Sequence, residues 1–233
     1  MSKLQKSALI IFLVLLFDQI LKIWVKTNMG IGDEFFVLGK WFIIHFVENN
    51  GMAFGFEFGG AFGKIFLSIF RVIASIAIGY YILKLVKKDI PMGFIACISL
   101  IFAGAVGNII DCAFYGLIFS HSDFKVVASL FPAGGGYETF LHGAVVDMFY
   151  FPIISGAYPS WVPFVGGSDF EFFRPVFNVA DSSISIGIFS IIIFYRKLFS
   201  ELTSKEEPQP QKDEAMVTET PDIDRENDSN EIN

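Results

Sequence analysis

Long apolar stretches separated by short polar segments dominate the pattern of this chain. A membrane-spanning helix needs about 20 apolar residues. Four stretches approach or reach that length, and they cover residues 8–25, 61–83, 92–110 and 176–195. The pattern therefore predicts an all-α membrane protein in which residues 1–200 form one domain of four transmembrane helices.

The segments between the apolar stretches have two different characters. Residues 35–38 and 41–47 are rich in aromatic and β-branched side chains and flank Gly39 and Lys40, which predicts a small β-hairpin at the membrane surface. Residues 112–174 form a long outer loop whose second half is dominated by aromatics and prolines. We expect both segments on the same, extracytoplasmic side.

Composition agrees with a membrane protein once the charge is divided along the chain. Hydrophobic residues make up 53% of it, and the net charge of −7 lies in the C-terminal segment. Residues 201–233 hold 11 acidic and 3 basic residues, whereas residues 1–200 have a net charge of +1. We expect a disordered acidic cytoplasmic tail at 201–233 and no nucleic-acid partner. Two cysteines and three scattered histidines show no metal-ligand spacing, so neither a metal nor a cofactor is expected.

Lysine and arginine residues are distributed unevenly around the apolar stretches. Seven of them flank the ends that we assign to the cytoplasm: Lys3, Lys6, Lys84, Lys87, Lys88, Arg196 and Lys197. The two longer outer segments hold only Lys26, Lys40, Lys125 and Arg174 clear of the helices. The positive-inside rule then places both termini in the cytoplasm of a multi-pass protein of the inner membrane.

Eight polar residues fall at the predicted outer ends of the spans or in the outer segments that follow them. Ionisable residues at such positions are usually functional. Asp147 and Asp181, if they meet, could share a proton and activate a water between them. Two unrelated helix caps or a structural ion pair would also explain them. The eight residues are Asp18, Lys22, Asn49, Asn108, Asp111, Asp147, Asn178 and Asp181.

Five sequence blocks resemble the lipoprotein signal peptidases, or signal peptidase II, the membrane aspartyl peptidases of bacteria. They are FDQILK at 17–22, ENNGMAFG at 48–55, AGAVGNIID at 103–111, VVDMFYF at 145–151 and FNVAD at 177–181. The resemblance implies that Asp147 and Asp181 are the catalytic pair. It also implies site-lining or supporting roles for Asp18, Lys22, Asn49, Gly51, Asn108, Asp111, Asn178 and Ala180.

Two positions depart from the family pattern. Cys112 stands where the family usually has Arg, which puts an arginine contact to substrate in doubt, and Met52 replaces a usual small residue. The outer segments, with WVPF and FFRPVFNVAD, are similar to members from the Bacteroidetes.

The family resemblance implies an aspartic endopeptidase that cleaves the signal peptide from diacylglyceryl-modified prolipoproteins on the periplasmic side of the membrane. We expect lipidated prolipoproteins and membrane lipids as partners and a monomeric enzyme. Which aspartate is the base stays open, because a coupled pair titrates as a unit.

A small proton-coupled transporter is the alternative, although four spans without internal repeats are few for a transporter. A non-catalytic scaffold would not need paired buried carboxylates, and no H-E-x-x-H motif supports a metallopeptidase.

Overall fold

The computed structural model describes residues 1–50, 60–172 and 174–204. The chain divides into two compact units, Met1–Arg196 and Lys197–Asn233. The second unit contains all but the first residue of the short helix α6 (Arg196–Ser204). Gly51 and nearly all of the predicted acidic tail lie outside the described residues.

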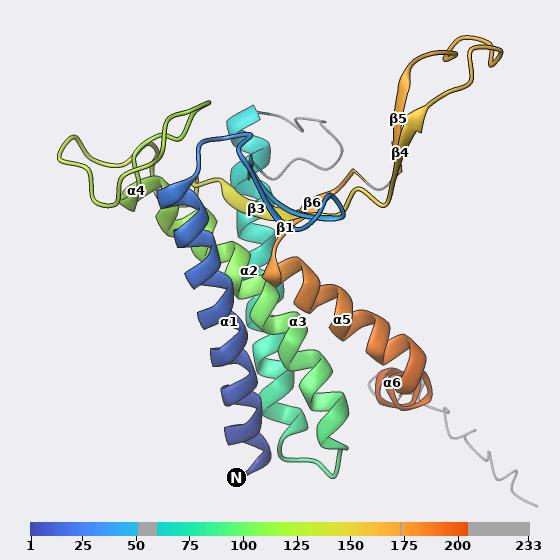
Figure 1. The fold of residues 1–233 in the computed structure, drawn as a ribbon. Helices are drawn as coiled ribbons and strands as arrows, with labels where there is room; N and C mark the ends of the chain where they lie inside the picture. The colour runs from blue at the N-terminus through green and yellow to red at the C-terminus, as the bar shows by residue number, and fades with distance from the viewer. Residues whose placement is uncertain (51–59, 173, 205–233) are drawn as a thin grey trace, which may run out of the picture. The chain divides into compact units, whose positions relative to one another are not determined.

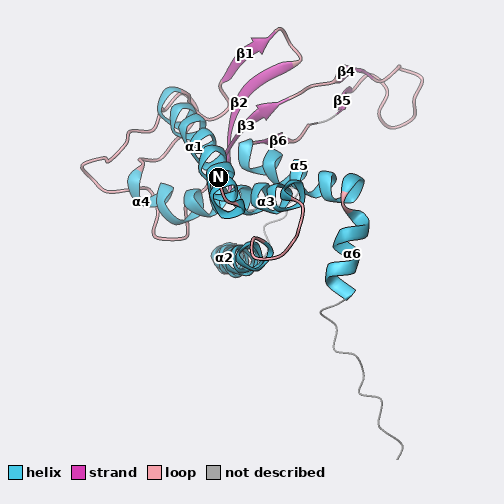
Figure 2. Ribbon diagram, turned by 90° about the horizontal axis from the view of Figure 1, so that it is seen from below, coloured by secondary structure: helices cyan, strands magenta, loops and turns pink. Residues whose placement is uncertain are grey.

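Four long helices form the lower part of the first unit in Figure 1. Helix α3 is central, because it packs against each of the other three, and Figure 2 shows this arrangement along the helix axes. It continues through a π-helical turn, η1 (Asp111–Tyr115), into the short α4 (Gly116–Ile118). The four helices are α1 (Lys3–Asn28), α2 (Gly60–Leu85), α3 (Met92–Ile110) and α5 (Val179–Phe194).

Three helical stretches in the described part of the chain are long and apolar enough to cross a membrane. They are Lys3–Asn28, Ile65–Leu85 and Met92–Ile118. A fourth span results only if Val179–Phe194 and Arg196–Thr203 count together as one broken span. The expected fourth span also begins too early, because its first two residues, Val176 and Phe177, pair as a strand before the helix starts at Val179.

An antiparallel sheet adjoins one end of the helices, so the chain is mostly helical rather than purely all-α. The predicted hairpin is present as β1 (Glu34–Leu38) and β2 (Phe42–Asn49). Two strands that the sequence pattern did not predict, β3 (Val145–Tyr150) and β6 (Val176–Phe177), extend it in the order β1-β2-β3-β6. A separate two-stranded sheet joins β4 (Ile154–Ala157) and β5 (Asp169–Phe172) in the outer loop.

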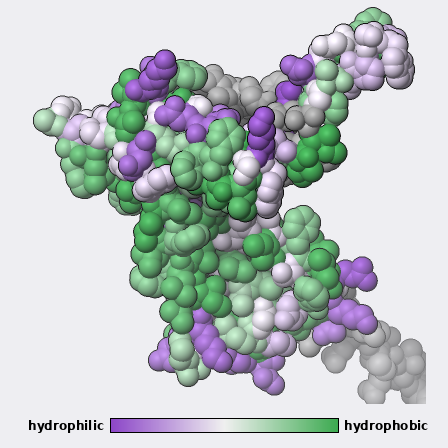
Figure 3. Space-filling view, in the orientation of Figure 1, coloured by the Kyte–Doolittle hydropathy of each residue, from purple (hydrophilic) through white to green (hydrophobic). Residues whose placement is uncertain are grey.

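The sheet and the helices share one hydrophobic core where they meet. Val25 and Met29 of α1 pack there with Phe46 of β2 and with Val146 and Met148 of β3. Below the sheet, Figure 3 shows a mostly hydrophobic surface over the helices. Large apolar side chains on α1, α2 and α5 are exposed, as expected of helices that face lipid.

Helices α3 and α5 approach each other closely at Gly104. A Cβ atom at Gly104 would lie 2.2 Å from the carbonyl oxygen of Ala180 and 2.7 Å from Ile184 Cγ1. Glycine is therefore required at this crossing. The close approach brings the outer end of α3, which carries Asn108, against the first turn of α5, which carries Asp181.

Candidate active site

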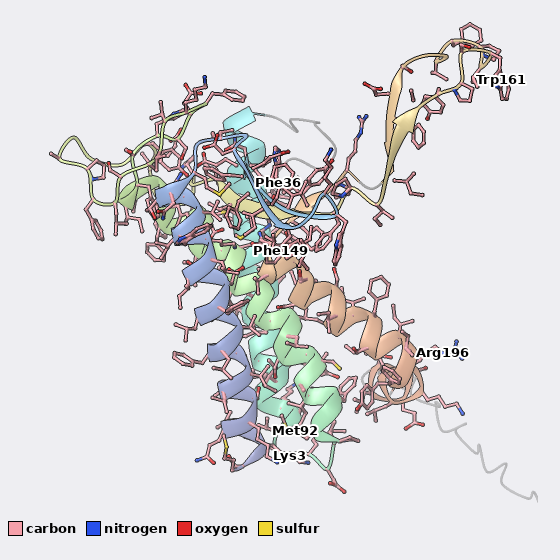
Figure 4. All side chains as sticks on the ribbon, in the orientation of Figure 1. Lys3, Phe36, Met92, Phe149, Trp161 and Arg196 are labelled. Atoms are coloured by element: carbon pink, nitrogen blue, oxygen red, sulfur yellow. The ribbon has the colours of Figure 1, made fainter. Side chains whose placement is uncertain are left out.

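The structure brings the eight predicted polar residues into one network of hydrogen bonds and ion pairs. They come from the elements that end or begin where the helices meet the sheet: the outer parts of α1 and α3, the start of η1, the end of β2, the middle of β3 and the start of α5. Figure 4 marks this region with Phe149, two residues after Asp147 on β3. Gly51, which the family resemblance also implies, lies outside the described residues.

Lys22 forms the buried ionic centre of the network. Its Nζ atom lies 2.9 Å from Asp18 Oδ2 and 2.8 Å from Asp111 Oδ2, and all three side chains are fully buried. Lys22 Nζ also donates a hydrogen bond of 3.0 Å to Asn108 Oδ1. A buried charge requires a partner, and here one ammonium group lies between two carboxylates.

The two carboxylates bound to Lys22 also hold the main chain beside the predicted catalytic residues. Asp18 Oδ1 accepts a hydrogen bond of 2.9 Å from the amide of Ala180, the residue before Asp181. Asp111 Oδ2 accepts one of 3.3 Å from the amide of Val146, the residue before Asp147. The ionic centre therefore fixes α5 and β3 relative to each other.

Asp181 lies in the first turn of α5, which begins with a reciprocal cap. Asn178 Oδ1 accepts the amide of Asp181 at 2.9 Å, and Asp181 Oδ2 accepts the amide of Asn178 at 3.3 Å. The helix-cap explanation of Asp181 is thus correct locally, but it is incomplete. Asp181 Oδ1 also accepts a hydrogen bond of 2.8 Å from Asn108 Nδ2 on α3.

Two asparagines connect Asp147 to Asp181. Asn178 Nδ2 donates to Asp147 Oδ1 at 2.7 Å and to Asn108 Oδ1 at 3.1 Å, and Asn108 Nδ2 continues to Asp181. On the other side of Asp147, Asn49 Nδ2 donates to Oδ2 at 3.2 Å. Each aspartate therefore accepts hydrogen bonds from amide groups that are themselves held by neighbouring elements.

The pKa of Asp147 is strongly perturbed. Burial of the carboxyl, followed by the nearby charge of Asp181, raises its pKa from the ordinary 3.8 to about 7. Hydrogen bonds from Asn49 and Asn178 and the charge of Lys22 act in the opposite direction but do not cancel the rise. Near neutral pH, Asp147 can therefore hold a proton while a second carboxyl lies close enough to influence it.

The sequence interpretation missed Gln19, a half-buried polar residue beside the ionic centre. Gln19 donates hydrogen bonds to Asp18 Oδ2 and Asp111 Oδ1, and accepts one from the Tyr115 hydroxyl. Its position in the FDQILK block, beside Asp18, was the available signal. These contacts add a neutral layer around the ionic centre.

Lys26 was wrongly placed in the outer loop. It lies in the last turn of α1, is fully buried, and binds Glu48 and Ser122 Oγ. The four-residue spacing of Asp18, Lys22 and Lys26 puts them along one helical face and could have revealed it. This second cluster joins α1 to the strand that ends in Asn49.

Comparison with known proteins identifies the family. The model of the signal peptidase (SPase) II family matches residues 10–197. A lipoprotein signal peptidase of Porphyromonas gingivalis is 53% identical over 205 residues, which cover 88% of each chain. A second, of Amoebophilus asiaticus, is 35% identical over 93% of this chain and 88% of its own length. A lipoprotein signal peptidase of Staphylococcus aureus is 32% identical over 86% of this chain and 93% of its own length.

Solved structures agree with the sequence relationship. One bacterial membrane enzyme aligns with a TM-score of 0.54 and 31% identity over 89% of this chain and 95% of its own. Another aligns with a TM-score of 0.52 and 32% identity over 81% and 91%. Family, relatives and fold coincide over the residues that build the network, and the chain belongs to the signal peptidase II family.

Proposed function

We propose that this signal peptidase II cleaves its substrates with Asp147 and Asp181 acting as an aspartic catalytic pair. Its relatives are named lipoprotein signal peptidases, and the chain accordingly removes signal peptides from prolipoproteins. The family match also argues against the alternative of a proton-coupled transporter.

One observation carries the assignment of the pair. Asp147 and Asp181 come from different elements, yet the amides of Asn178 and Asn108 link them through three hydrogen bonds. A structural ion pair does not account for this arrangement, because Lys22 contacts neither carboxylate and binds Asp18 and Asp111 instead. Two acidic groups linked through neutral amides suit a site in which one proton is shared.

The raised pKa of Asp147 suggests how the two roles divide. Asp181, as the carboxylate, takes a proton from water, and the water oxygen attacks the scissile carbonyl carbon. Asp147 gives its proton to the carbonyl oxygen, which produces a tetrahedral diol. When the C–N bond breaks, Asp147 recovers a proton from the diol, and Asp181 protonates the departing amine. Both aspartates thus return to their starting states.

The distribution of basic residues indicates on which side of the membrane the proposed reaction takes place. Lys3 Nζ donates to the carbonyl of Lys88 at 3.0 Å, so the basic N-terminus and the basic α2–α3 connection lie together. Figure 4 shows Lys3 and Met92 at one end of the helices, with Phe36 and Phe149 at the other. The positive-inside rule assigns the basic end to the cytoplasm and the aspartates to the periplasmic side of the inner membrane.

We further propose that the substrate carries a diacylglyceryl group and that the enzyme acts as a monomer. A signal helix that enters sideways from lipid would reach the network without crossing the outer sheet. The exposed apolar side chains of α2 and α5 are compatible with a lipid-side approach. Residues 1–200 would form the peptidase domain, followed by a cytoplasmic tail.

Cleavage of a purified lipidated precursor tests the catalytic pair. Asp147→Asn and Asp181→Asn should each fold and should each lose cleavage by several orders of magnitude, because a carboxamide cannot exchange the proton. Asp89→Asn, at the exposed end of the α2–α3 connection, is the matched control and should cleave normally. Near-normal turnover in either variant of the pair would refute the assignment, while an unlipidated precursor tests the lipid requirement separately.

A further inference from the structure

Helix α2 contributes a single arginine to the interior side of the first unit. Arg71 is half-buried, and its Nη1 donates to Cys112 Sγ at 3.7 Å. Arg71 lies six residues inside the apolar span that begins at Ile65, which is about 9 Å along the helix axis. A guanidinium group at that depth is costly unless a polar partner satisfies it.

Within residues 1–50, 60–172 and 174–204, the contact that Arg71 makes occupies one of the five N–H donors of its guanidinium group. None of the ion pairs among the described residues includes it. Its hydrogen-bond partner in the described part of the chain is a thiol, which is a weak acceptor. The guanidinium group of Arg71 carries a permanent positive charge. The site therefore calls for oxygen acceptors, which a bound ligand can supply.

A second donor lies one turn further along the same face of α2. Ser75 is buried, and its hydroxyl has no hydrogen-bond partner among the described residues. Arg71 and Ser75 are four residues apart, so they are neighbours on the helix surface. The opposite face of α2 carries exposed apolar side chains, including Phe70 and Ile73. The interior face of α2 therefore offers two donor side chains without matching oxygen acceptors in the described part of the chain.

The contact with Cys112 places Arg71 near the depth of the catalytic pair. Cys112 follows Asp111, which binds the amide of Val146, and Val146 precedes Asp147. A substrate whose scissile bond lies at Asp147 therefore presents the residues just before that bond near this level. Phospholipid phosphates lie outside the apolar core, so they match this depth less well than a substrate group does.

We propose that Arg71 binds the substrate by donating hydrogen bonds to main-chain carbonyl oxygens at the C-terminal end of its signal-peptide helix. The last four carbonyl groups of a helix have no partner within the helix, and this end carries partial negative charge. In the orientation proposed above, the signal helix ends towards the periplasmic side, where the bond is cleaved. Arg71 supplies a cation and a planar set of donors at that end.

This inference rests on the proposed site, and the test separates binding from chemistry. Steady-state cleavage of a lipidated precursor gives KM and kcat for the reconstituted enzyme. Arg71→Leu should raise KM about tenfold to a hundredfold and leave kcat within about twofold, since a hydrogen bond to a charged group is lost from the bound substrate. Arg71→Gln, which keeps donors but not the charge, should fall between. Lys84→Leu, near the other end of the same helix, is the control and should leave both constants unchanged.

A relocated guanidinium distinguishes binding from a purely structural role. Cys112 lies in contact with Arg71, so Arg71→Leu combined with Cys112→Arg returns the charge to the same space from η1. This double variant should recover most of the lost KM. An unchanged KM in Arg71→Leu, a loss confined to kcat, or no recovery in the double variant would overturn the proposal.

The carbonyl oxygens of the lipid are the other source of the same chemistry. A precursor whose two acyl esters are replaced by alkyl ethers lacks those oxygens but keeps the peptide carbonyls. The effect of Arg71→Leu on KM should persist with this precursor; its disappearance would assign Arg71 to the ester groups and refute the helix-end contact. Asp147→Asn tests the catalytic pair independently, because it should abolish kcat whether or not Arg71 binds substrate.

Discussion

The burial of Asp147 predicts that stability depends on pH in the opposite sense to an ordinary ion-paired carboxylate. Burial and the charge of Asp181 raise the pKa of Asp147 from 3.8 to about 7. The folded state therefore holds this proton more tightly than the unfolded state does. As the pH rises from about 4 to about 7, the unfolded chain has already lost the proton and the folded state loses stability.

The size of the effect follows from the pKa difference. A shift from 3.8 to about 7 corresponds to about 4 kcal/mol between the two protonation states at the alkaline limit. Between pH 5 and pH 8 the contribution changes by about 2.5 kcal/mol. Asp147→Asn removes the titration but keeps the shape of the side chain. From pH 5 to pH 8, the free energy of unfolding of the variant should therefore rise by about 2.5 kcal/mol relative to that of the wild type.

Unfolding of both proteins in the same detergent, followed at several pH values, measures this difference. The relevant quantity is the change with pH of the difference in free energy of unfolding between variant and wild type. Any effect of the amide that does not depend on pH cancels from this change. Infrared spectroscopy gives a second readout, because the component of the protonated-carboxyl band that titrates around pH 7 in the wild type should be missing from the variant. The raised pKa of Asp147 would be refuted by a difference in unfolding free energy that stays constant between pH 5 and pH 8, together with the absence of such a band component.

Three further changes test the network and the tail. Lys22→Met leaves Asp18 and Asp111 buried without their cation, and should lower the free energy of unfolding by about 3 to 5 kcal/mol, measured by denaturation in detergent. Asn178→Ala removes the cap of α5 and the contact to Asp147, and should lower kcat in the cleavage assay at least tenfold while costing about 1 kcal/mol of stability. Deletion of residues 205–233 should leave cleavage and membrane insertion unchanged; a large loss would show that the acidic tail has a required partner.

Hydropathy and charge predicted three of the four spans and the polar residues well, because a bilayer imposes length and polarity on every spanning segment. The third predicted span coincides with α3, and the first and second lie inside α1 and α2. All the implied site residues that the structure describes are in one network. The family motifs were necessary for this step, since hydropathy alone does not say which helix ends meet.

The sheet and its strand β3 show where the sequence interpretation failed. The sequence predicted one long outer loop over residues 112–174, but residues 145–150 form a strand that pairs with β2, with Asp147 opposite Val47. A strand buried on both faces lacks the alternation that reveals a half-exposed strand. Residues 145–148 are all buried, so the pattern carried no such signal.

The register between β2 and β3 nevertheless determines how the site is built. Asn49 lies at the end of β2 and donates to Asp147, while Glu48 beside it binds the buried Lys26 of α1. The same strand is thus fixed to α1 on one side and to Asp147 on the other. A slip of one residue would turn Asn49 away from Asp147, because neighbouring residues of a strand point to opposite faces.

The two ionic clusters of α1 give a physical reason for the charged face of a membrane helix. Lys22 holds Asp18 and Asp111, and these carboxylates bind the main chain immediately before Asp181 and Asp147. The lysine itself need not touch the reacting groups to determine their separation. A hydrophobic side chain could fill the same volume, but it could not orient two carboxylates towards two amide groups. The charge on α1 therefore sets the spacing of the proposed catalytic pair, and the two aspartates are linked to each other through neutral asparagines.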